Sequence, residues 1–383
     1  MKFHYILCLF LFLTNIIEAQ ELYFPERYPQ WETKQSSEFN ISDQLLSQAV
    51  SFAEENEYSG PRDLRSAILK GFEREPFHKI VGPTKKRGGP AGMVLKDGYL
   101  IAQWGDISRV DMTFSVTKSF LSTTTALAWD NGLISDLQGK VEQFVWDGTF
   151  EGKHNSKISW EHLLHQTSDW SGNLWGGLDW ADRPPREGGI DDWKNRPLVE
   201  PGTVMEYNDV RVNVLAYAMT HVWRQPLPEV LKNQVMDPIG ASTTWRWFGY
   251  DNAWTEIDGV QMKSVSGGGH SGGGMFINTM DMARFGLLFM ADGKWKNEQL
   301  ISQAWIDKAT SPSVPNPNYG YMWWLNEKGS RHWEGLPDSL FYAAGFGGNF
   351  IVIDQKNNLV IVTRWLEPSK LEEFLNLVYT ALP

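Results

Sequence analysis

The tetrad Ser115-Val116-Thr117-Lys118 stands where a short apolar segment turns into a helix, and no other Ser-x-x-Lys occurs in the chain. Residues three apart on a helix lie on the same face. The tetrad therefore brings a hydroxyl within hydrogen-bond reach of an amine, as a serine nucleophile and its base require. Taken alone, it also fits a helix-capping serine followed by a solvated lysine.

The pattern around the tetrad predicts strands at both ends of the chain and helices in the middle. Residues 92–104 read as two strands joined by an Asp97-Gly98 turn, and further strands are expected at 340–344, 350–353 and 359–365. Apolar residues at helical spacing predict helices at 160–166, 210–223, 279–290 and 369–380, the third of them capped by Thr279. We therefore expect an α/β domain from residues 20–130 and 259–383, with an N-terminal arm at 20–40 and a mostly helical domain, 131–258, inserted.

The first nineteen residues predict a secretory signal peptide. Lys2 supplies the positive charge, residues 5–17 are apolar, and cleavage is expected before Gln20. The sole cysteine, Cys8, lies inside this segment, so the mature chain has no thiolate for catalysis or metal binding. We expect a periplasmic or secreted protein without an integral membrane segment after cleavage. A net charge of −11 and the brevity of the basic run Lys85-Lys86-Arg87 exclude nucleic acid as an expected partner.

Three further segments turn the tetrad into a constellation. They are Leu163-Leu164-His165-Gln166-Thr167-Ser168, then Pro201-Gly202-Thr203-Val204-Met205-Glu206-Tyr207-Asn208-Asp209, and Gly273-Gly274-Met275 leading into Asp281-Met282-Ala283-Arg284-Phe285. In this order and spacing, over roughly residues 90–365, they resemble the serine β-lactamase and penicillin-binding-protein superfamily. The resemblance is to its class C-like branch, on the side of the esterases and aminohexanoate-oligomer hydrolases. It implies an α+β fold, in which helices flank an antiparallel sheet.

The resemblance implies a role for each matching residue. Ser115 matches the nucleophile, Lys118 its partner base, and Tyr207 the tyrosine of the family's Tyr-x-Asn, whose asparagine position is here Asp209. The family's Lys/His-Thr/Ser-Gly strand best matches Ala343-Ala344-Gly345, so the cation that helps to bind a substrate carboxylate is missing.

Elementary chemistry adds two expectations. Lys118 can accept a proton at neutral pH only if burial or a nearby cation lowers its pKa. The backbone N–H groups of Ser115 and Phe346 are expected to stabilise the oxyanion.

Other patterns compete with this interpretation. Gly269-His270-Ser271-Gly272-Gly273 satisfies the nucleophile elbow of α/β-hydrolases, with His332 and one of Asp281, Asp292 and Asp307 as partners. The segment before Ser271 makes a poor strand, however, and the next helix starts late. His162 and His165 lie one turn apart without a third ligand, so we expect a structural role and no metal site. For His270, contact with a substrate and bonding to backbone both stay open.

The chain is rich in tryptophan, with 19 in all, and several lie in the loop 169–196, which has no helical or strand period. We expect this loop to fold over the Ser115 cleft, and one or more of Trp170, Trp175 and Trp180 to contact substrate together with Asp209, His270 and Gly345. The alternative is that these tryptophans anchor the loop to the helical domain.

The prediction is therefore an exported, cofactor-free serine hydrolase that forms an acyl-enzyme on Ser115 with a small ester or amide. The alternatives are a true β-lactamase or D-Ala-D-Ala carboxypeptidase, a non-catalytic cell-wall sensor or binding module on the same fold, and an α/β-hydrolase using Ser271.

Overall fold

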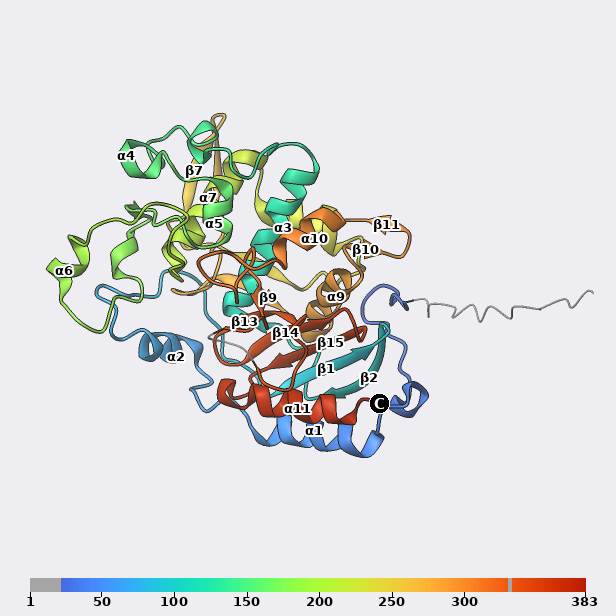
Figure 1. Ribbon diagram of the computed structural model, residues 1–383. Helices are drawn as coiled ribbons and strands as arrows, with labels where there is room; N and C mark the ends of the chain where they lie inside the picture. The colour runs from blue at the N-terminus through green and yellow to red at the C-terminus, as the bar shows by residue number, and fades with distance from the viewer. Residues whose placement is uncertain (1–21, 330–332) are drawn as a thin grey trace, which may run out of the picture.

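The computed structural model describes residues 22–329 and 333–383, and its centre is a six-stranded antiparallel sheet. The strand order is β12-β13-β14-β15-β1-β2. The last strand in the sequence, β15, therefore pairs with the first, β1 (Figure 1). The six strands are β1 (Ala91–Lys96), β2 (Tyr99–Trp104), β12 (Trp324–Leu325), β13 (Phe341–Gly345), β14 (Asn349–Asp354) and β15 (Leu359–Arg364). This confirms the predicted sheet and the strands at 340–344, 350–353 and 359–365.

Helices cover both faces of this sheet. Helices α1 (Asp43–Glu55) and α11 (Leu371–Ala381) lie side by side on one face, and α9 (Thr279–Met290) packs on the other (Figure 1). Alternate strand residues belong to different cores: Val94 and Ile361 pack with α1 and α11, whereas Met93 and Val360 pack with the α9 side. Because both faces are buried, the strands read as nearly continuous apolar runs.

The predicted hairpin at Asp97-Gly98 is confirmed. Both turn residues have positive φ, 51° and 86°, as a type I′ turn requires, and this turn matches the twist of the flanking strands. At Gly98 a Cβ atom would also lie 1.8 Å from the carbonyl oxygen of Tyr23, so the N-terminal arm can pass close to the turn.

Above the sheet lies a mostly helical part built around α3 (Thr117–Asp130), which packs against α7 (Asp209–Trp223) and α8 (Leu227–Leu231) (Figure 1). Residues Thr117–Ala128 of α3 are all buried, so the helix runs through the interior. A small sheet joins the two parts, in the order β3 (Asp111–Met112), β9 (Gly274–Ile277) and β6 (Arg246–Phe248). The domain boundary predicted at 258/259 falls in the turn between β7 (Trp254–Ile257) and β8 (Val260–Lys263), where Ile257 pairs with Val260.

The predicted helices at 160–166, 210–223, 279–290 and 369–380 correspond to α5, α7, α9 and α11. One detail is wrong: the N-cap of α9 is Asn278, not Thr279, because the Asn278 side chain accepts the N–H of Asp281 at 2.8 Å. The remaining elements are α2 (Leu64–Gly71), α4 (Gly152–Asn155), α5 (Trp160–Leu164), α6 (Ile190–Lys194), α10 (Gln303–Ala309), β4 (Asn173–Leu174), β5 (Gly177–Leu178), β10 (Lys294–Trp295) and β11 (Glu298–Gln299).

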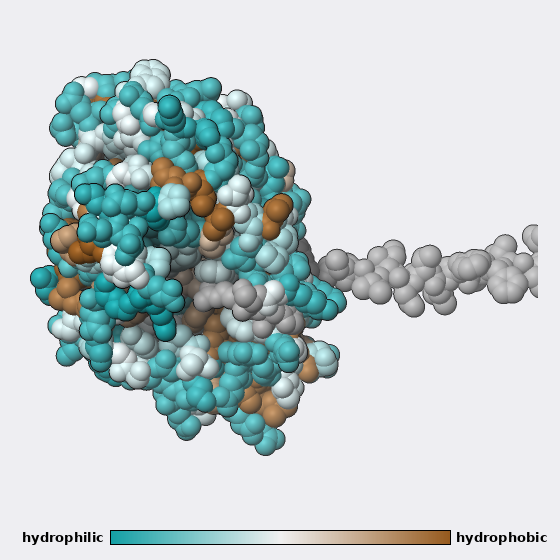
Figure 2. Space-filling model, turned by 60° about the vertical axis from the view of Figure 1, so that its left-hand side comes forward, coloured by the Kyte–Doolittle hydropathy of each residue, from teal (hydrophilic) through white to brown (hydrophobic). Residues whose placement is uncertain are grey.

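The predicted signal peptide, residues 1–19, lies outside the described residues. Among the residues that are described, none of the helices combines the length and the apolar character needed to cross a bilayer. On the face shown in Figure 2, hydrophilic side chains predominate and the hydrophobic ones form small, separate patches.

Candidate active site

Ser115 lies in a strained turn at the start of the buried helix α3. It belongs to a 3₁₀ turn, Phe114–Val116, and is half-buried, whereas its neighbours on both sides are buried. Phe114 has a φ of 52°, a costly conformation for an aromatic residue. Packing holds it there, because its ring lies 5.1 Å from that of Phe346 and 6.4 Å from that of Trp365. The turn thus presents the Ser115 hydroxyl toward a cavity.

The structure brings the predicted residues Ser115, Lys118, Tyr207 and Asp209 together. Lys118 Nζ donates to Ser115 Oγ at 2.8 Å and to Asp209 Oδ1 at 2.6 Å. The same Nζ lies 4.7 Å from the centre of the Tyr207 ring. Lys118 and Asp209 are each 2% exposed, so their ion pair is screened from water. The hydroxyl and amine of the tetrad are therefore bonded, as helical spacing predicted.

The condition under which Lys118 could accept a proton at neutral pH, a lowered pKa, is not met in the resting site. Burial is the largest single influence and disfavours the ammonium form, but the charge and hydrogen bond of Asp209, together with Tyr207, outweigh it and raise the pKa of Lys118. Burial likewise opposes the charge of Asp209, yet Lys118 and Arg183 hold the pKa of that carboxyl well below its usual range. Lys118 is therefore an ammonium group that donates to Ser115. The departure from the family's asparagine at Asp209 has this direct electrostatic consequence.

The start of α7 positions Asp209. Asn208 caps the helix by accepting the N–H of Arg211 at 3.1 Å, and Asp209 is its first residue. Asp182 accepts the N–H of Asp209 and that of Val210, the latter at 3.2 Å. Carboxylates are favoured at this end of a helix because the unpaired N–H groups there carry partial positive charge.

Arg183 is a site residue that sequence reasoning missed. Its guanidinium lies 2.6 Å from Asp209 Oδ2 and 2.6 Å from Asp182 Oδ1, and 5.2 Å from the centre of the Tyr207 ring. Burial would lower its pKa, but Asp182 and Asp209 raise it instead. No spacing in the sequence announces this contact. The one local signal is its place in the aromatic loop 169–196, which we expected to cover the cleft.

His270 also reaches the cluster. Its Nε2 lies 2.6 Å from Glu75 Oε2, and its Nδ1 lies 3.2 Å from Arg183 Nη2. A guanidinium can only donate, so Nδ1 accepts, and the proton is assigned to Nε2, which donates to Glu75. Both ring nitrogens thus contact side chains, whereas we had considered a backbone partner or a substrate contact. The ring is also one of the walls of the cavity beside Ser115.

The cavity beside Ser115 has a volume of about 820 Å³. The predicted residues that line it are Ser115, Tyr207, Asp209, His270, Gly345 and Phe346. Aromatic side chains are the largest group in its wall: Tyr58, Phe72, Phe114, Tyr207, Trp324, Trp333, Tyr342, Phe346 and Phe350. Within the described part of the chain, its charged lining consists of Arg183, Asp209 and Glu372, with His270 beside them. The cavity therefore suits a largely apolar molecule of small to medium size.

Gly345 brings the end of β13 against the turn that holds Ser115. A Cβ atom at Gly345 would lie 2.0 Å from the carbonyl oxygen of Thr113, so only glycine allows this approach. The next residue, Phe346, lines the cavity together with Ser115. Ala343, in the position of the family's cation, is 1% exposed and brings no charge.

The tryptophan prediction is wrong in its details. Trp170, Trp175 and Trp180 are not among the residues that line the Ser115 cavity. Trp170 is 2% exposed and donates to the Thr149 carbonyl, Trp175 packs edge-on against Tyr217, and Trp180 packs against Phe77. Their rings anchor the loop, because burying an indole stabilises more than leaving it over an open cavity. The loop reaches the site through Asp182 and Arg183 instead.

Within the described residues, the elbow pattern at Ser271 lacks the strand that such a site needs. Ser271 Oγ lies 3.4 Å from His78 Nε2, but no strand leads directly into it, since β8 ends at Lys263. Asp281 is bonded to Ser242 and Asn278, and His332 lies outside the described residues.

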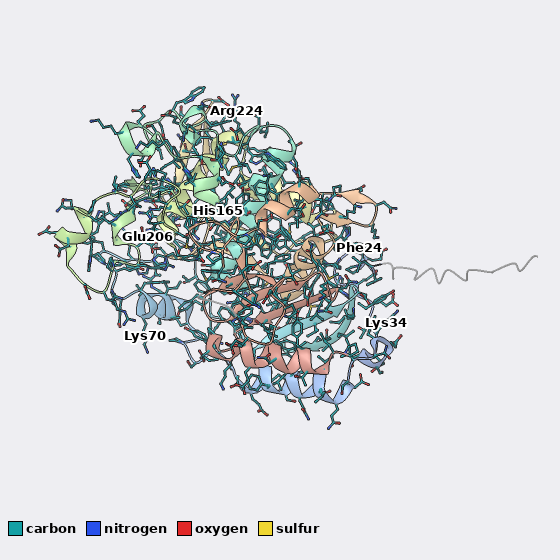
Figure 3. The ribbon with its side chains drawn as sticks, in the orientation of Figure 1. Phe24, Lys34, Lys70, His165, Glu206 and Arg224 are labelled. Atoms are coloured by element: carbon teal, nitrogen blue, oxygen red, sulfur yellow. The ribbon has the colours of Figure 1, made fainter. Side chains whose placement is uncertain are left out.

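His162 in α5 and His165 at its C-cap both contact protein groups. The Nδ1 of His162 accepts the N–H of Ser159 at 3.2 Å, which caps the helix. His165 lies inside the helical part (Figure 3), where its ring packs on Tyr321 and burial lowers its pKa to about 4.

Comparisons with known proteins identify the family and the fold. A model of the Beta-lactamase family matches residues 86–365. The N-acetylmuramyl-L-alanine amidase of Bacillus subtilis (strain 168) is 29% identical over 114 residues, which are 29% of this chain and 24% of the amidase. The chain thus spans about a quarter of that relative's length.

Three solved structures illustrate the likeness in fold. The hydrolase EstCE1, described as having promiscuous acyltransferase activity, has a TM-score of 0.59 at 14% identity, covering 89% of this chain and 99% of its own. A putative 6-aminohexanoate-dimer hydrolase from Bacillus anthracis has a TM-score of 0.53 at 13% identity, covering 91% and 97%. A β-lactamase/D-alanine carboxypeptidase from Pseudomonas syringae has a TM-score of 0.56 at 13% identity, covering 88% and 98%. With a family model that spans most of its length, this chain belongs to the Beta-lactamase family and has the β-lactamase/transpeptidase fold.

Proposed function

We propose that the protein is an exported serine hydrolase that cleaves a small ester or amide through an acyl-enzyme on Ser115. The observation that carries this proposal is the bond between Lys118 Nζ and Ser115 Oγ, 2.8 Å long, at the edge of an aromatic cavity. A nucleophile bonded to an amine, with a tyrosine beside both, supplies the groups that acyl transfer needs.

In the proposed reaction, Ser115 Oγ attacks the carbonyl carbon and Lys118 takes its proton. Tyr207 then gives a proton to the leaving group, and water releases the acyl group by the reverse transfers. The N–H groups of Ser115 and Phe346 stabilise the oxyanion, each contributing roughly 3–4 kcal/mol in hydrolases of this kind. Because Asp209 raises the pKa of Lys118, little of the lysine is a neutral amine at pH 7. The neutral fraction, which is the form that can accept the proton of Ser115, increases as the pH rises. We therefore expect the rate of acylation to increase toward alkaline pH.

The cavity favours an uncharged substrate. Its wall is rich in aromatic side chains, and the charge of Arg183 is already engaged by Asp182 and Asp209. A substrate carboxylate would find no cation at Ala343, where the family's strand carries one. Among the structures that share the fold, one is named as a putative 6-aminohexanoate-dimer hydrolase and another as a hydrolase with promiscuous acyltransferase activity. We therefore place this protein with hydrolases of neutral esters or small amides.

The test combines a covalent probe with matched serine variants. Wild-type protein should react with a fluorophosphonate, and mass spectrometry should find the adduct on Ser115. Ser115→Ala should lose both labelling and the hydrolysis of short-chain p-nitrophenyl esters, while Ser271→Ala should keep at least roughly a tenth of the rate. Labelling of Ser271 would support the nucleophile elbow, and a folded wild-type protein that neither labels nor turns over would support a binding module. A β-lactamase or D-Ala-D-Ala carboxypeptidase would be acylated efficiently by penicillin.

Export is tested separately. Residues 1–19 have the charge and apolar run of a signal peptide. If the protein is expressed with its native N-terminus, the mature chain should appear outside the cytoplasm and begin at Gln20. Recovery of the full-length chain in the cytoplasm would contradict this part of the proposal.

A further inference from the structure

Beside the cavity at Ser115 lies a second, small one of about 80 Å³ whose wall is rich in metal-ligating side chains. Glu75, His78 and His270 each offer one ligand atom there, and the three atoms lie within 4.8 Å of one another. Ser271 and Asp182 line the same cavity. We propose that Glu75, His78 and His270 form a binding site for a divalent transition-metal ion, Zn²⁺ foremost.

The donor set suits such an ion. Two imidazoles and one carboxylate are a ligand combination that binds Zn²⁺ in proteins, with water or another oxygen in the fourth position. In a tetrahedral site with bonds of about 2.1 Å, neighbouring ligand atoms lie roughly 3.4 Å apart. His78 Nε2 and Ser271 Oγ already lie 3.4 Å apart, and His270 Nε2 lies 2.6 Å from Glu75 Oε2. A small rotation of the Glu75 side chain therefore makes room for the ion, and Ser271 or water completes the set.

The surroundings support this assignment. The side chains of Glu75 and His270 are each 6% exposed, so both ligands are held in place by packing. A buried carboxylate needs a cation or several hydrogen bonds to compensate its charge. Glu75 accepts from His270 and from the N–H of Arg183, and Asp182 Oδ1 lies 3.9 Å from His270 Nε2. Two positive charges would repel a bound cation. Arg183, which is paired with Asp182, lies 3.2 Å from His270 Nδ1, and the exposed Lys79 borders the cavity.

The backbone shows how the site is assembled. Gly269, Gly272, Gly273 and Gly274 all have positive φ, between 70° and 87°, so this run folds back on itself and turns His270 and Ser271 toward the segment of Glu75 and His78. Val81 and Gly82 both donate to the Ser271 carbonyl, which fixes the two segments side by side. The glycine-rich run that resembled a nucleophile elbow therefore has a different role, as one half of the metal site.

Metal binding would also reach the catalytic cluster. In the structure, His270 Nδ1 accepts from Arg183 and Nε2 carries the proton. An ion on Nε2 requires the ring proton to move to Nδ1, so the neutral imidazole neither gains nor loses a proton overall. The Nδ1–H then faces Asp209 Oδ2, at 3.5 Å, and Arg183 loses its acceptor on the ring. Asp209 pairs with Lys118 and Arg183 pairs with Asp209, so the ion and the Ser115 site are coupled through His270.

The experiment measures binding directly. The protein is prepared without a histidine tag, stripped with EDTA and titrated with Co²⁺ and with Zn²⁺. We expect one ion per chain, a visible Co²⁺ spectrum of four-coordinate type, and displacement of Co²⁺ by Zn²⁺. His78→Ala and the isosteric Glu75→Gln should each weaken binding at least about tenfold. His221→Ala, which removes a half-buried histidine outside the cavity, is the matched control and should bind as the wild type does.

Three outcomes would overturn the proposal. The first is that the wild type binds no stoichiometric metal ion. The second is that His78→Ala and Glu75→Gln bind the ion as tightly as the wild type does. The third is that His221→Ala loses binding. Circular dichroism of each variant separates loss of the site from loss of the fold. Because the readout is binding and not turnover, the result is independent of whether Ser115 is the nucleophile.

Discussion

Removing the carboxylate of Asp209 should destabilise the protein strongly at neutral pH and much less at pH 9. In Asp209→Ala, Lys118 remains buried without its partner. Breaking a buried ion pair in this way typically costs about 3–5 kcal/mol. The cost has an upper limit, because Lys118 can instead give up its proton. With an ordinary pKa of 10.5 for lysine in the unfolded chain, neutralising it costs at most about 5 kcal/mol at pH 7 and about 2 kcal/mol at pH 9.

The sign of the pH dependence follows from proton linkage. In the wild type the pKa of Lys118 is raised, so its stabilisation is fully present below pH 10.5 and does not change between pH 7 and 9. In Asp209→Ala the folded state favours the neutral amine while the unfolded chain stays protonated. Stability of the variant therefore rises with pH, by up to about 1.4 kcal/mol per pH unit.

Urea denaturation of wild type and variant at pH 7 and pH 9 measures both quantities. Glu200→Ala is the matched control, because Lys157–Glu200 is an ion pair of similar length, 2.7 Å, whose partners are 49% and 59% exposed. Exposed pairs contribute about 0–1 kcal/mol. A loss below about 1 kcal/mol in Asp209→Ala at pH 7, or a loss that is the same at both pH values, would refute the reasoning.

Three further predictions concern activity. Asp209→Asn should move the rising limb of the pH–rate profile for ester hydrolysis to lower pH, because it removes the charge that raises the pKa of Lys118; an unmoved profile would exclude Lys118 as the titrating base. Nitrocefin should be hydrolysed at least tenfold less efficiently than the best p-nitrophenyl ester, since a missing charge-assisted hydrogen bond at Ala343 is worth roughly 1.5–3 kcal/mol; comparable kcat/KM values would contradict this. Gly345→Ala should abolish ester hydrolysis, because its Cβ would lie 2.0 Å from the Thr113 carbonyl oxygen, and steady-state kinetics at wild-type level would show that β13 can move away without loss.

Much of the fold could be predicted because it depends on local patterns. The type I′ turn at Asp97-Gly98 requires positive φ at two successive residues, which that dipeptide tolerates. The helices α7, α9 and α11 follow the apolar period, and their bounds differ from the prediction by no more than two residues. The N-cap of α9 could not be decided in this way, because Asn278 and Thr279 are both good caps and packing selects between them.

The candidate site was predictable to the extent that it is local or shared with the family. Ser115 and Lys118 are three residues apart on one helix, and Tyr207 came with the family resemblance. The prediction for the tryptophans was wrong for a physical reason. Aromatic content indicates that a loop is anchored by packing, but it does not indicate which side of the loop faces the cleft. Arg183, which lies in that same loop and does reach the cleft, carries no pattern that distinguishes it from a surface arginine.

By itself, the sequence determined the nucleophile's local geometry, the order of the elements and the family, because each of these depends on neighbouring residues or on the spacing of motifs. Only the tertiary structure decided the charge state of the site. Lys118 meets Asp209 across 91 residues of chain, and His270 meets Glu75 across 195. Whether a buried lysine is a base or an ammonium, and whether a histidine lies beside a second histidine and a carboxylate, depends on distances of a few ångströms between segments far apart in sequence. The free energy of a charge is set by those distances and by burial, and neither is written in the order of the residues.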